Sequence, residues 1–253
     1  MPPPDPTRIA LISDVHGNLT ALRAVLDDIE SRGVERIFNL GDLVGKGPRC
    51  AEVVELSRER CEVHVQGNWE ASLTDPDRPS GNTAGDWWLG QLADEQREWL
   101  WELPFCHDFT MSGRSVRIFH ASAKSVFHRV FSDRDEAEFA GMFANTEATG
   151  GGPLPDVVGY GDIHEPYLDS GAGDRLLFNV GSVGNNLYEP TPVYAIIEGT
   201  HGSTEAAPFT VQFVRVPYDV ESEIAYARRT SMPARDLWEV ELRTGVYRGD
   251  QQG

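Results

Sequence analysis

The chain has 253 residues, 40% of them hydrophobic, which is enough for one large α/β domain whose core can support a rigid site. Its formal net charge of −18 at pH 7 repels polyanions, which argues against nucleic-acid polymers and anionic membrane surfaces as partners and favours a small ligand. Three widely spaced cysteines without a CxxC pair, no leader-like start and no run long enough to span a bilayer predict a cytoplasmic protein.

The first quarter of the chain has the pattern of repeated strand and helix units. Residues 8–13 form a short apolar run that predicts a buried strand, and 19–32 have apolar residues at helical spacing. A second apolar run at 36–40 completes a β-α-β unit, whose two strands are normally parallel in one sheet. A further helix at 51–60 and strand at 61–65 are expected to extend this sheet.

The pattern changes after the third strand. Residues 75–103 begin with a turn-rich stretch and continue into a tryptophan-rich helical region, which we interpret as a helical insertion within a single domain of residues 1–253. Beyond it strands dominate, so sheets with helices on their outer faces are expected. The remaining strands are predicted at 105–111, 115–120, 156–160, 175–180, 193–198 and 210–216, with helices near 133–144 and 219–229.

Side chains able to bind metal ions follow five of the predicted strands. Asp14 and His16 stand two residues apart where the first strand ends, so both can reach one ion. A glycine precedes Asp42 and another precedes Asn68, which allows close backbone approach. Because ligands gather at the carboxyl ends of strands in α/β sheets, five such junctions together predict a binding site. The candidate donors are Asp14, His16, Asp42, Asn68, His120, Asp162 and His164.

The order of these motifs resembles the calcineurin-like metallophosphoesterase superfamily. The order is D-x-H, then G-D, then G-N, then a histidine that ends a strand, then a variant of G-H-x-H. Two stretches, DVHGN at 14–18 and NVGSVG at 179–184, are most similar to the small bacterial phosphodiesterases of that superfamily. The resemblance covers roughly residues 9–198 and implies a four-layer αββα sandwich of two mixed β-sheets flanked by helices.

The resemblance also implies a dinuclear metal-dependent phosphoesterase, in which a hydroxide that bridges two metal ions attacks the phosphorus. Two divalent cations are therefore expected, manganese first, with iron, magnesium, nickel or zinc as alternatives. Catalytic roles are implied for Asp42, Asn68 and His120. One metal would be held by Asp14, His16 and His164 and the second by Asn68, His120 and Asp162, with Asp42 bridging the two.

Three positions depart from the pattern of the family. Asp162 stands where a histidine is usual; it would favour manganese, magnesium or iron over copper if it ligates, and the alternative is that it does not ligate. Trp69 replaces a histidine that serves related phosphatases as an acid, so we expect a preference for good leaving groups. Lys46 replaces an arginine, and it either contacts phosphate as a point charge or lies solvated in its loop.

Four side chains are candidates for contact with a substrate, namely Lys46, Asn18, Asn186 and His128. An amide can orient a phosphate or a hydroxyl, although capping of turns is the commoner role for both asparagines. Glu70 is expected to orient the loop that carries Asn68. His64 lies between two valines in a predicted strand, so it is expected to pack or form hydrogen bonds instead of binding metal.

Three functions are compatible with the sequence. The first is a phosphodiesterase acting on small nucleotides or similar diesters, as the resemblance implies. A phosphomonoesterase or protein phosphatase would use the same metals, but a diester carries less negative charge than a monoester, and Lys46 is the one evident cation near the site. A catalytically weak interaction scaffold, similar to the retromer scaffold subunit, would be expected to lack ligands. The native metal, substrate and oligomeric state stay open.

Overall fold

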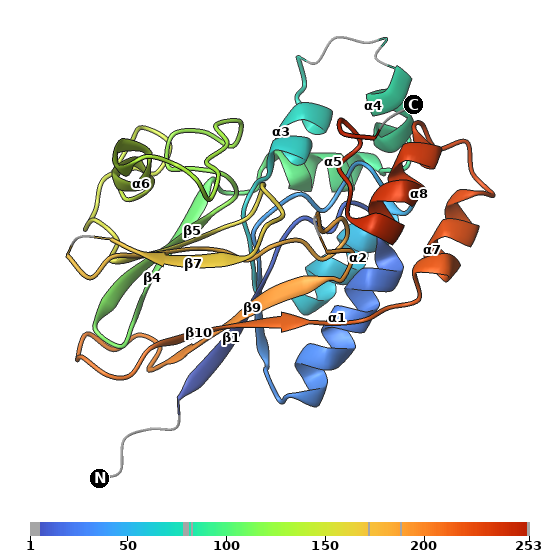
Figure 1. Ribbon diagram of the computed structural model, residues 1–253. Helices are drawn as coiled ribbons and strands as arrows, with labels where there is room; N and C mark the ends of the chain where they lie inside the picture. Colours follow the sequence, from blue (N-terminus) through green and yellow to red (C-terminus); the bar gives the residue numbers. More distant parts are fainter. Residues whose placement is uncertain (1–5, 78–80, 82, 172, 188, 252–253) are drawn as a thin grey trace.

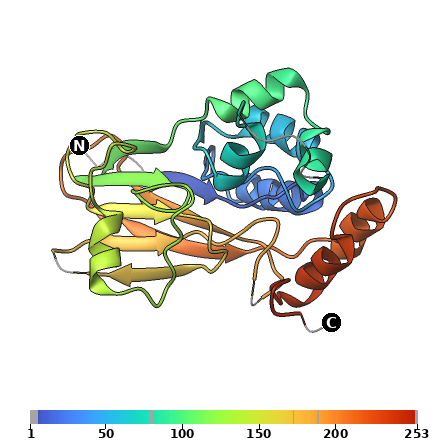
Figure 2. The ribbon, with the colours of Figure 1, turned by 90° about the horizontal axis from the view of Figure 1, so that it is seen from above.

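Two five-stranded β-sheets, packed face to face, form the centre of the molecule (Figures 1 and 2). The computed structural model describes residues 6–77, 81, 83–171, 173–187 and 189–251. The first sheet contains, in spatial order, β10 (Thr210–Arg215), β9 (Val193–Gly199), β1 (Thr7–Ile12), β2 (Arg36–Asn39) and β3 (Val63–His64). The second contains β4 (Cys106–Met111), β5 (Arg114–Phe119), β6 (Val157–Tyr160), β8 (Leu176–Asn179) and β7 (Tyr167–Ser170). Both sheets combine parallel and antiparallel pairs.

Helices cover the outer faces of both sheets. The first sheet is covered by α1 (Leu19–Ser31) and α2 (Cys50–Arg60), and the second by α6 (Glu136–Met142). The other helices are α3 (Asn68–Thr74), α4 (Thr83–Leu89), α5 (Asp94–Trp101), α7 (Val220–Ala227) and α8 (Arg235–Thr244). Figure 2 shows α7 and α8 as a hairpin at one end of the molecule. Among the described helices, none is long and apolar enough to cross a bilayer.

The strand β1 shows why the sheets stack in this way. Ile9 and Leu11 belong to the core between the two sheets, whereas Ala10 and Ile12 belong to the core between the first sheet and its helices. Successive side chains of a strand point to opposite faces, so a strand that is apolar at every position must be covered on both. Each fully buried aliphatic side chain contributes roughly 1.5–3 kcal/mol, which makes the four-layer arrangement the stable one for this sequence.

The expected arrangement of two mixed sheets flanked by helices is confirmed, but three elements of this architecture were missed, namely α3, β7 and α8. The strand β7 has an exposed, mostly polar sequence, so its apolar pattern is too weak to recognise. The helix α8 begins after Ala234, whose side chain cannot cap a helix and whose φ is +52°. The usual polar start signal is therefore absent. The interpretation of the whole chain as one domain with an insertion at 75–103 stays a prediction; α4 and α5 lie within that range.

His64 has the structural role expected from its sequence position. Its Nε2 lies 3.1 Å from Ser57 Oγ, and its ring contacts the edge of Trp99 at a centroid distance of 5.0 Å. Burial disfavours the charged imidazolium and lowers the pKa of His64 from 6.5 to about 4. The residue is therefore neutral in the folded protein at neutral pH, and it packs between α2 and α5.

This burial predicts a pH dependence of stability. Between pH 6.5 and about 4 the unfolded chain binds a proton at His64 that the folded chain does not, so acid favours unfolding. The contribution of neutral His64 to the free energy of unfolding is fully present above pH 6.5. Below that pH it falls by at most about 1.4 kcal/mol per pH unit. Urea unfolding of the wild type and His64→Gln across this range measures it. The free energy of the wild type should fall more steeply; parallel curves would contradict the assignment.

Candidate metal centre

The seven candidate donors lie on five segments, four loops and the first residue of α3, that meet where the two sheets adjoin. Each segment follows the carboxyl end of a strand, namely β1, β2, β3, β5 or β6. Backbone hydrogen bonds hold the loops together: Asp14 N donates to Gly41 O at 3.0 Å, and Gly161 N donates to His120 O at 2.8 Å. The amide of Asp162 donates to Asp14 Oδ2 at 3.0 Å, which joins a loop of the second sheet to one of the first. All seven side chains are thereby brought together.

The backbone of these loops is unusual. Non-glycine residues rarely adopt positive φ, because the Cβ crowds the backbone there, and such strain persists where the surrounding structure enforces it. Most of the non-glycine residues that have positive φ in the described chain lie at this site. They are Asp14, His16, Asp42, Lys46, Asp162 and His164, with φ between 48° and 66°.

The glycines before the donors permit the close approach that the sequence indicated. A Cβ at Gly41, whose φ is +93°, would lie 2.7 Å from Gly67 N. A Cβ at Gly67 would lie 2.2 Å from Asp42 Oδ1. Real Cβ atoms do not come so close to other atoms, so these two loops can contact only through glycine. The expectation of close backbone approach at both positions is confirmed.

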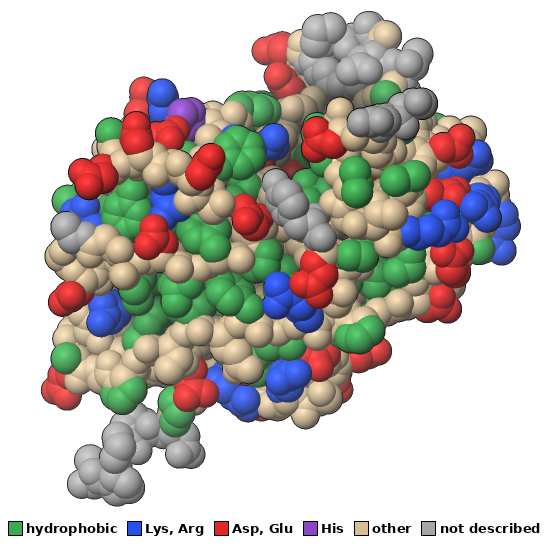
Figure 3. All heavy atoms as spheres, in the orientation of Figure 1, with side chains coloured by type: hydrophobic (Ala, Val, Ile, Leu, Met, Phe, Trp, Pro, Cys, Tyr) green, Lys and Arg blue, Asp and Glu red, His purple; other side chains and the backbone are tan. Residues whose placement is uncertain are grey.

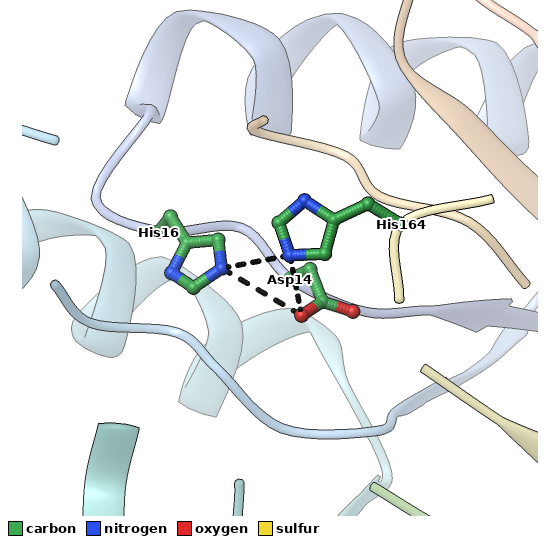
Figure 4. A group of neighbouring side chains, drawn as sticks. All are labelled: Asp14, His16 and His164. Carbon is green, nitrogen blue, oxygen red and sulfur yellow. Dashed lines mark hydrogen bonds and ion pairs between the residues drawn. The ribbon is translucent and has the colours of Figure 1, made fainter. Parts of the chain in front are cut away.

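Asp14, His16 and His164 form the first group of donors, and Figure 4 shows the three side chains pointing toward one another. The two Nε2 atoms of His16 and His164 are 3.2 Å apart, and His164 Nε2 lies 3.1 Å from Asp14 Oδ1. Each imidazole has its Nδ1 against a backbone carbonyl, which accepts only: His16 against Val44 O at 3.1 Å, and His164 against Asn185 O. Nδ1 therefore carries the hydrogen, and the Nε2 lone pairs face each other.

Such an arrangement requires a positive charge between its donors. Asp14 Oδ1 is buried and has no hydrogen-bond donor among the described residues. Burial by itself would raise the pKa of Asp14, but the imidazoles of His164 and His16 outweigh it and hold the pKa well below its usual range. Burial and the nearby Lys46 charge lower the pKa of His16 to about 4, so its ring is neutral. A carboxylate and two imidazoles, buried and facing one another, suit a divalent metal ion.

The second group contains Asp42, His120, Asn68 and Asp162. His120 donates from Nδ1 to Leu40 O at 2.8 Å, and its Nε2 lies 3.0 Å from Asn68 Oδ1 and 3.5 Å from Asp42 Oδ1. Asp162 Oδ1 is 3.9 Å from the same nitrogen. Although burial opposes it, the carboxylates of Asp42 and Asp14 raise the pKa of His120 well above its ordinary value. This group also attracts a cation.

Asp42 stands between the two groups. Its Oδ1 faces His120, whereas its Oδ2 lies 3.6 Å from His16 Nε2. The backbone amide of Trp69 donates to Oδ1 at 2.9 Å and fixes this orientation. Because each oxygen faces a different group, Asp42 is placed to contact both ions of a pair, and Asp14 belongs to both clusters of donors. The geometry fits two cations that share ligands.

Glu70 organises the loops that carry Asp42 and Asn68. It is fully buried, and its carboxylate accepts hydrogen bonds from the amides of Asp42 and Leu43 at 2.7 Å and from Gly67 at 2.9 Å. One side chain therefore holds both loops, as expected from the sequence for the Asn68 loop. Burial and the neighbouring Asp42 charge raise the pKa of Glu70 to about 7.

Arg129 was missed by the sequence analysis. It donates to both oxygens of Asp162, from Nε at 3.0 Å and from Nη2 at 2.9 Å. Asp162 is a carboxylate at a position where the family usually has a neutral imidazole, so Arg129 balances the extra negative charge. The sequence did contain one signal, because the additional negative charge of Asp162 predicts a basic residue near it.

The candidates for substrate contact are placed differently from one another. Lys46 Nζ lies 3.5 Å from His164 Nε2 and donates to Asn185 Oδ1 at 3.0 Å, so it is beside the metal-ligand candidates. The Asn18 side chain accepts from Ala21 N and caps α1, and its Nδ2 donates to Gly184 O at 2.9 Å. Asn186 Nδ2 donates within its own loop, to the carbonyls of residues 189 and 191. His128 lines a separate surface depression.

A cavity of about 320 Å³ opens beside the donors, at the small end of the range for ligand sites. The molecular surface in Figure 3 has acidic and basic side chains interspersed on this face, which agrees with the ion pairs that most described arginines form. The C-terminal segment contributes to the cavity wall, which the sequence did not indicate. Its lining residues are Asp42, Lys46, Trp69, Arg129, Phe131, Asp162, Ile163, His164, Leu187, Tyr247, Arg248 and Asp250.

Comparison with known proteins agrees with this geometry. A metallophosphoesterase of Sphaerobacter thermophilus is 28% identical in sequence, and its crystal structure covers 95% of this chain and 99% of its own with a TM-score of 0.71. A hypothetical protein of Pyrococcus horikoshii, 17% identical, covers the same shares with a TM-score of 0.77 and shares the fold. An uncharacterized protein of Methanocaldococcus jannaschii is 29% identical over 89% of this chain and 93% of its own.

The family itself is shown by a match to a family model. Residues 7–202 match the calcineurin-like phosphoesterase superfamily domain, and this range contains all seven candidate donors and Lys46. The match ends before α7 and α8, so the C-terminal hairpin lies outside it. With its two mixed sheets, its inward-facing donors and this match, the chain belongs to the calcineurin-like phosphoesterase superfamily, whose members are metal-dependent phosphoester hydrolases.

Proposed function

We propose that this protein hydrolyses small phosphodiesters at a site for two divalent metal ions. The observation that carries the proposal is the pair of buried donor groups, Asp14 with His16 and His164, and Asp42 with His120 and Asp14, whose carboxylate oxygens and imidazole nitrogens converge within 4.8 Å in each group. The packing of a hydrophobic core does not require polar donor atoms to converge in this way. A pair of cations would stabilise them.

The residues fit the metals as follows. One ion would be held by Asp14, His16 and His164 and the other by Asn68, His120 and Asp162, with Asp42 between them. When bound, the two cations supply an activated water and withdraw charge from the phosphoryl oxygens. Manganese is the proposed metal, because oxygen donors that are typical of magnesium and manganese are combined with imidazoles that suit iron, nickel or zinc.

The residues of the chain bind and orient the substrate. Lys46 is held by Asn185 with its Nζ beside His164, from which it can donate to an unesterified phosphoryl oxygen. The indole ring of Trp69 lies edge-on to His16, at a centroid distance of 5.8 Å, and lines the cavity without offering an acidic proton. We propose that Asp42, Asn68 and His120 lie at the reacting phosphate, and that the leaving group must depart without help from residue 69.

Charge favours a diester over a monoester. Arg129 and Arg248 also line the cavity, but Arg129 is paired with Asp162 and Arg248 with Glu241. Among the described residues, this leaves Lys46 as the lining cation without a carboxylate partner. A single cation without a carboxylate partner matches the single charge of a diester better than the nearly double charge of a monoester. The full set of donors supports an active enzyme over a scaffold.

The proposed partners follow from the same charges. A small phosphoester in the cytoplasm is the proposed substrate, and a polymer of nucleic acid is disfavoured by the net charge of −18. The cavity of about 320 Å³ is suited to a small molecule.

Activity after metal exchange tests the proposal. The protein is stripped with chelator and restored with manganese, and turnover of aryl diesters, aryl monoesters and cyclic nucleotides is measured. The diesters should be hydrolysed fastest. Asp42→Asn, which weakens the contact to both ions, should lower kcat/KM by at least about a hundredfold, whereas Glu95→Gln, at an exposed carboxylate, should leave it unchanged. The proposal would be overturned if the protein hydrolysed none of these substrates.

The role of Asp162 can be measured by metal content. We expect Asp162→Ala to lose most of one manganese ion, because the second group would keep one carboxylate instead of two. The Arg129→Met variant tests the neighbouring ion pair: it should retain both ions, since Arg129 balances charge without ligating. Elemental analysis after gel filtration gives the stoichiometry, with the wild type as reference. Two ions in Asp162→Ala would remove this residue from the ligand set.

Because Trp69 cannot act as an acid, we expect the rate of hydrolysis to depend on the leaving group. For a series of aryl diesters, log kcat/KM should fall steeply as the pKa of the released phenol rises, because no imidazole protonates the leaving oxygen. Trp69→His should flatten the dependence, and Trp69→Phe, which keeps an aromatic ring, should not. A flat dependence in the wild type would show that another group supplies the proton.

A further inference from the structure

The C-terminal segment reaches the cavity although it lies beyond the family match. Tyr247, Arg248 and Asp250 line the cavity, whereas the match ends at residue 202. The hairpin of α7 and α8 has its own small core around Trp238. It is joined to the rest of the protein through the buried Glu223, which pairs with Arg49. The C-terminal segment is therefore folded against the rest of the protein and forms part of the cavity wall.

Glu241 fixes the position of Arg248. The carboxylate of Glu241 is fully buried and accepts from Arg248 Nε at 2.8 Å, from Nη2 at 2.6 Å and from its backbone amide at 2.9 Å. The third guanidinium nitrogen, Nη1, forms no hydrogen bond with any residue of the described chain. A planar guanidinium held at one edge leaves its other edge available to an anionic oxygen.

Asn185 connects this pair to the metal-ligand candidates. Its Nδ2 donates to Glu241 Oε2 at 3.2 Å, its Oδ1 accepts from Lys46 Nζ at 3.0 Å, and its backbone carbonyl lies against His164 Nδ1. One asparagine therefore orients Lys46 and is tied to the carboxylate that orients Arg248. The network combines two cations with one carboxylate, so it keeps one net positive charge facing the cavity.

We infer that Arg248 is a specificity-determining residue that binds a second anionic oxygen group of the substrate, remote from the scissile phosphorus, and that Glu241 is its positioning residue. The inference rests on the proposed function, because it assumes that Lys46 and the metals hold the phosphate. The cavity lining also includes apolar Ile163 and Leu187, which suit a short carbon spacer between the two anionic groups. The substrate class is thus a small phosphoester that also carries a carboxylate or a further phosphate.

Binding of inert probes tests this inference without turnover. Manganese-loaded protein is titrated calorimetrically with methylphosphonate, with phosphonocarboxylates whose carbon spacers increase in length, and with the matching bisphosphonates. At the best spacer, the second anionic group should tighten binding by about tenfold, equivalent to about 1.4 kcal/mol. Comparison of the carboxylate and phosphonate arms identifies which group the site prefers.

Variants assign the effect to the residue. Arg248→Met should abolish the gain and leave the affinity for methylphosphonate unchanged, and Arg248→Lys should recover part of it, because lysine keeps the charge without the fork. Arg243→Met is the matched control: Arg243 pairs with Glu221 in the same bidentate way but does not line the cavity. This variant should keep the full gain. Thermal unfolding confirms that each variant is folded.

Two outcomes would overturn the inference. One is equal affinity of the wild type for methylphosphonate and for every longer probe, and the other is a gain that persists in Arg248→Met. Failure of the proposed function would give a different result. If the gain in affinity depends on Arg248 but the protein hydrolyses no phosphoester, the anion subsite is supported and the proposed hydrolase activity is not.

Discussion

The convergence of carboxylate, amide and imidazole groups in one buried site is the constraint on which the rest of this structure depends. His16, His120 and His164 each have Nδ1 against a backbone carbonyl, so each presents Nε2 to carboxylate or amide oxygens a few ångströms away. Without a cation, this geometry would cost free energy through repulsion and lost hydration. Left-handed backbone at Asp14 and Asp42, and contacts possible only for glycine, keep the donors in place.

Charge balance around the site explains residues that are not ligand candidates. The bidentate pair of Arg129 with Asp162 offsets a carboxylate that replaces the usual imidazole of the family. Glu70 forms no ion pair with another described residue, and its buried carboxylate instead accepts hydrogen bonds from backbone amides of the two loops beside it. The net charge of −18 and the small cavity are both compatible with small ligands bound by local cations.

The C-terminal hairpin adds specificity to a site built from another part of the chain. The candidate donors lie within the family match, whereas Glu241 and Arg248 lie outside it, and Arg248 lines the cavity. A reaction common to a superfamily can thus be directed to a particular substrate by a segment that contributes no metal ligand. Asn185 is the physical connection between the two parts, because it contacts both Lys46 and Glu241.

The sequence by itself indicated sheets with helices on their outer faces and the candidate donors, because apolar periodicity and the polar residues that end buried strands are local features, and the order of its motifs implied the layered fold by resemblance. It could not show that Asn18 and Asn186 use their amides for capping and for a loop, or that His128 lies at another depression. The sequence also could not identify Arg129 and Arg248 as the basic residues of the site, and α8 lacked a capping signal at Ala234. These contacts join residues far apart in the chain, and only tertiary packing decides which distant side chains share a charge or a cavity wall.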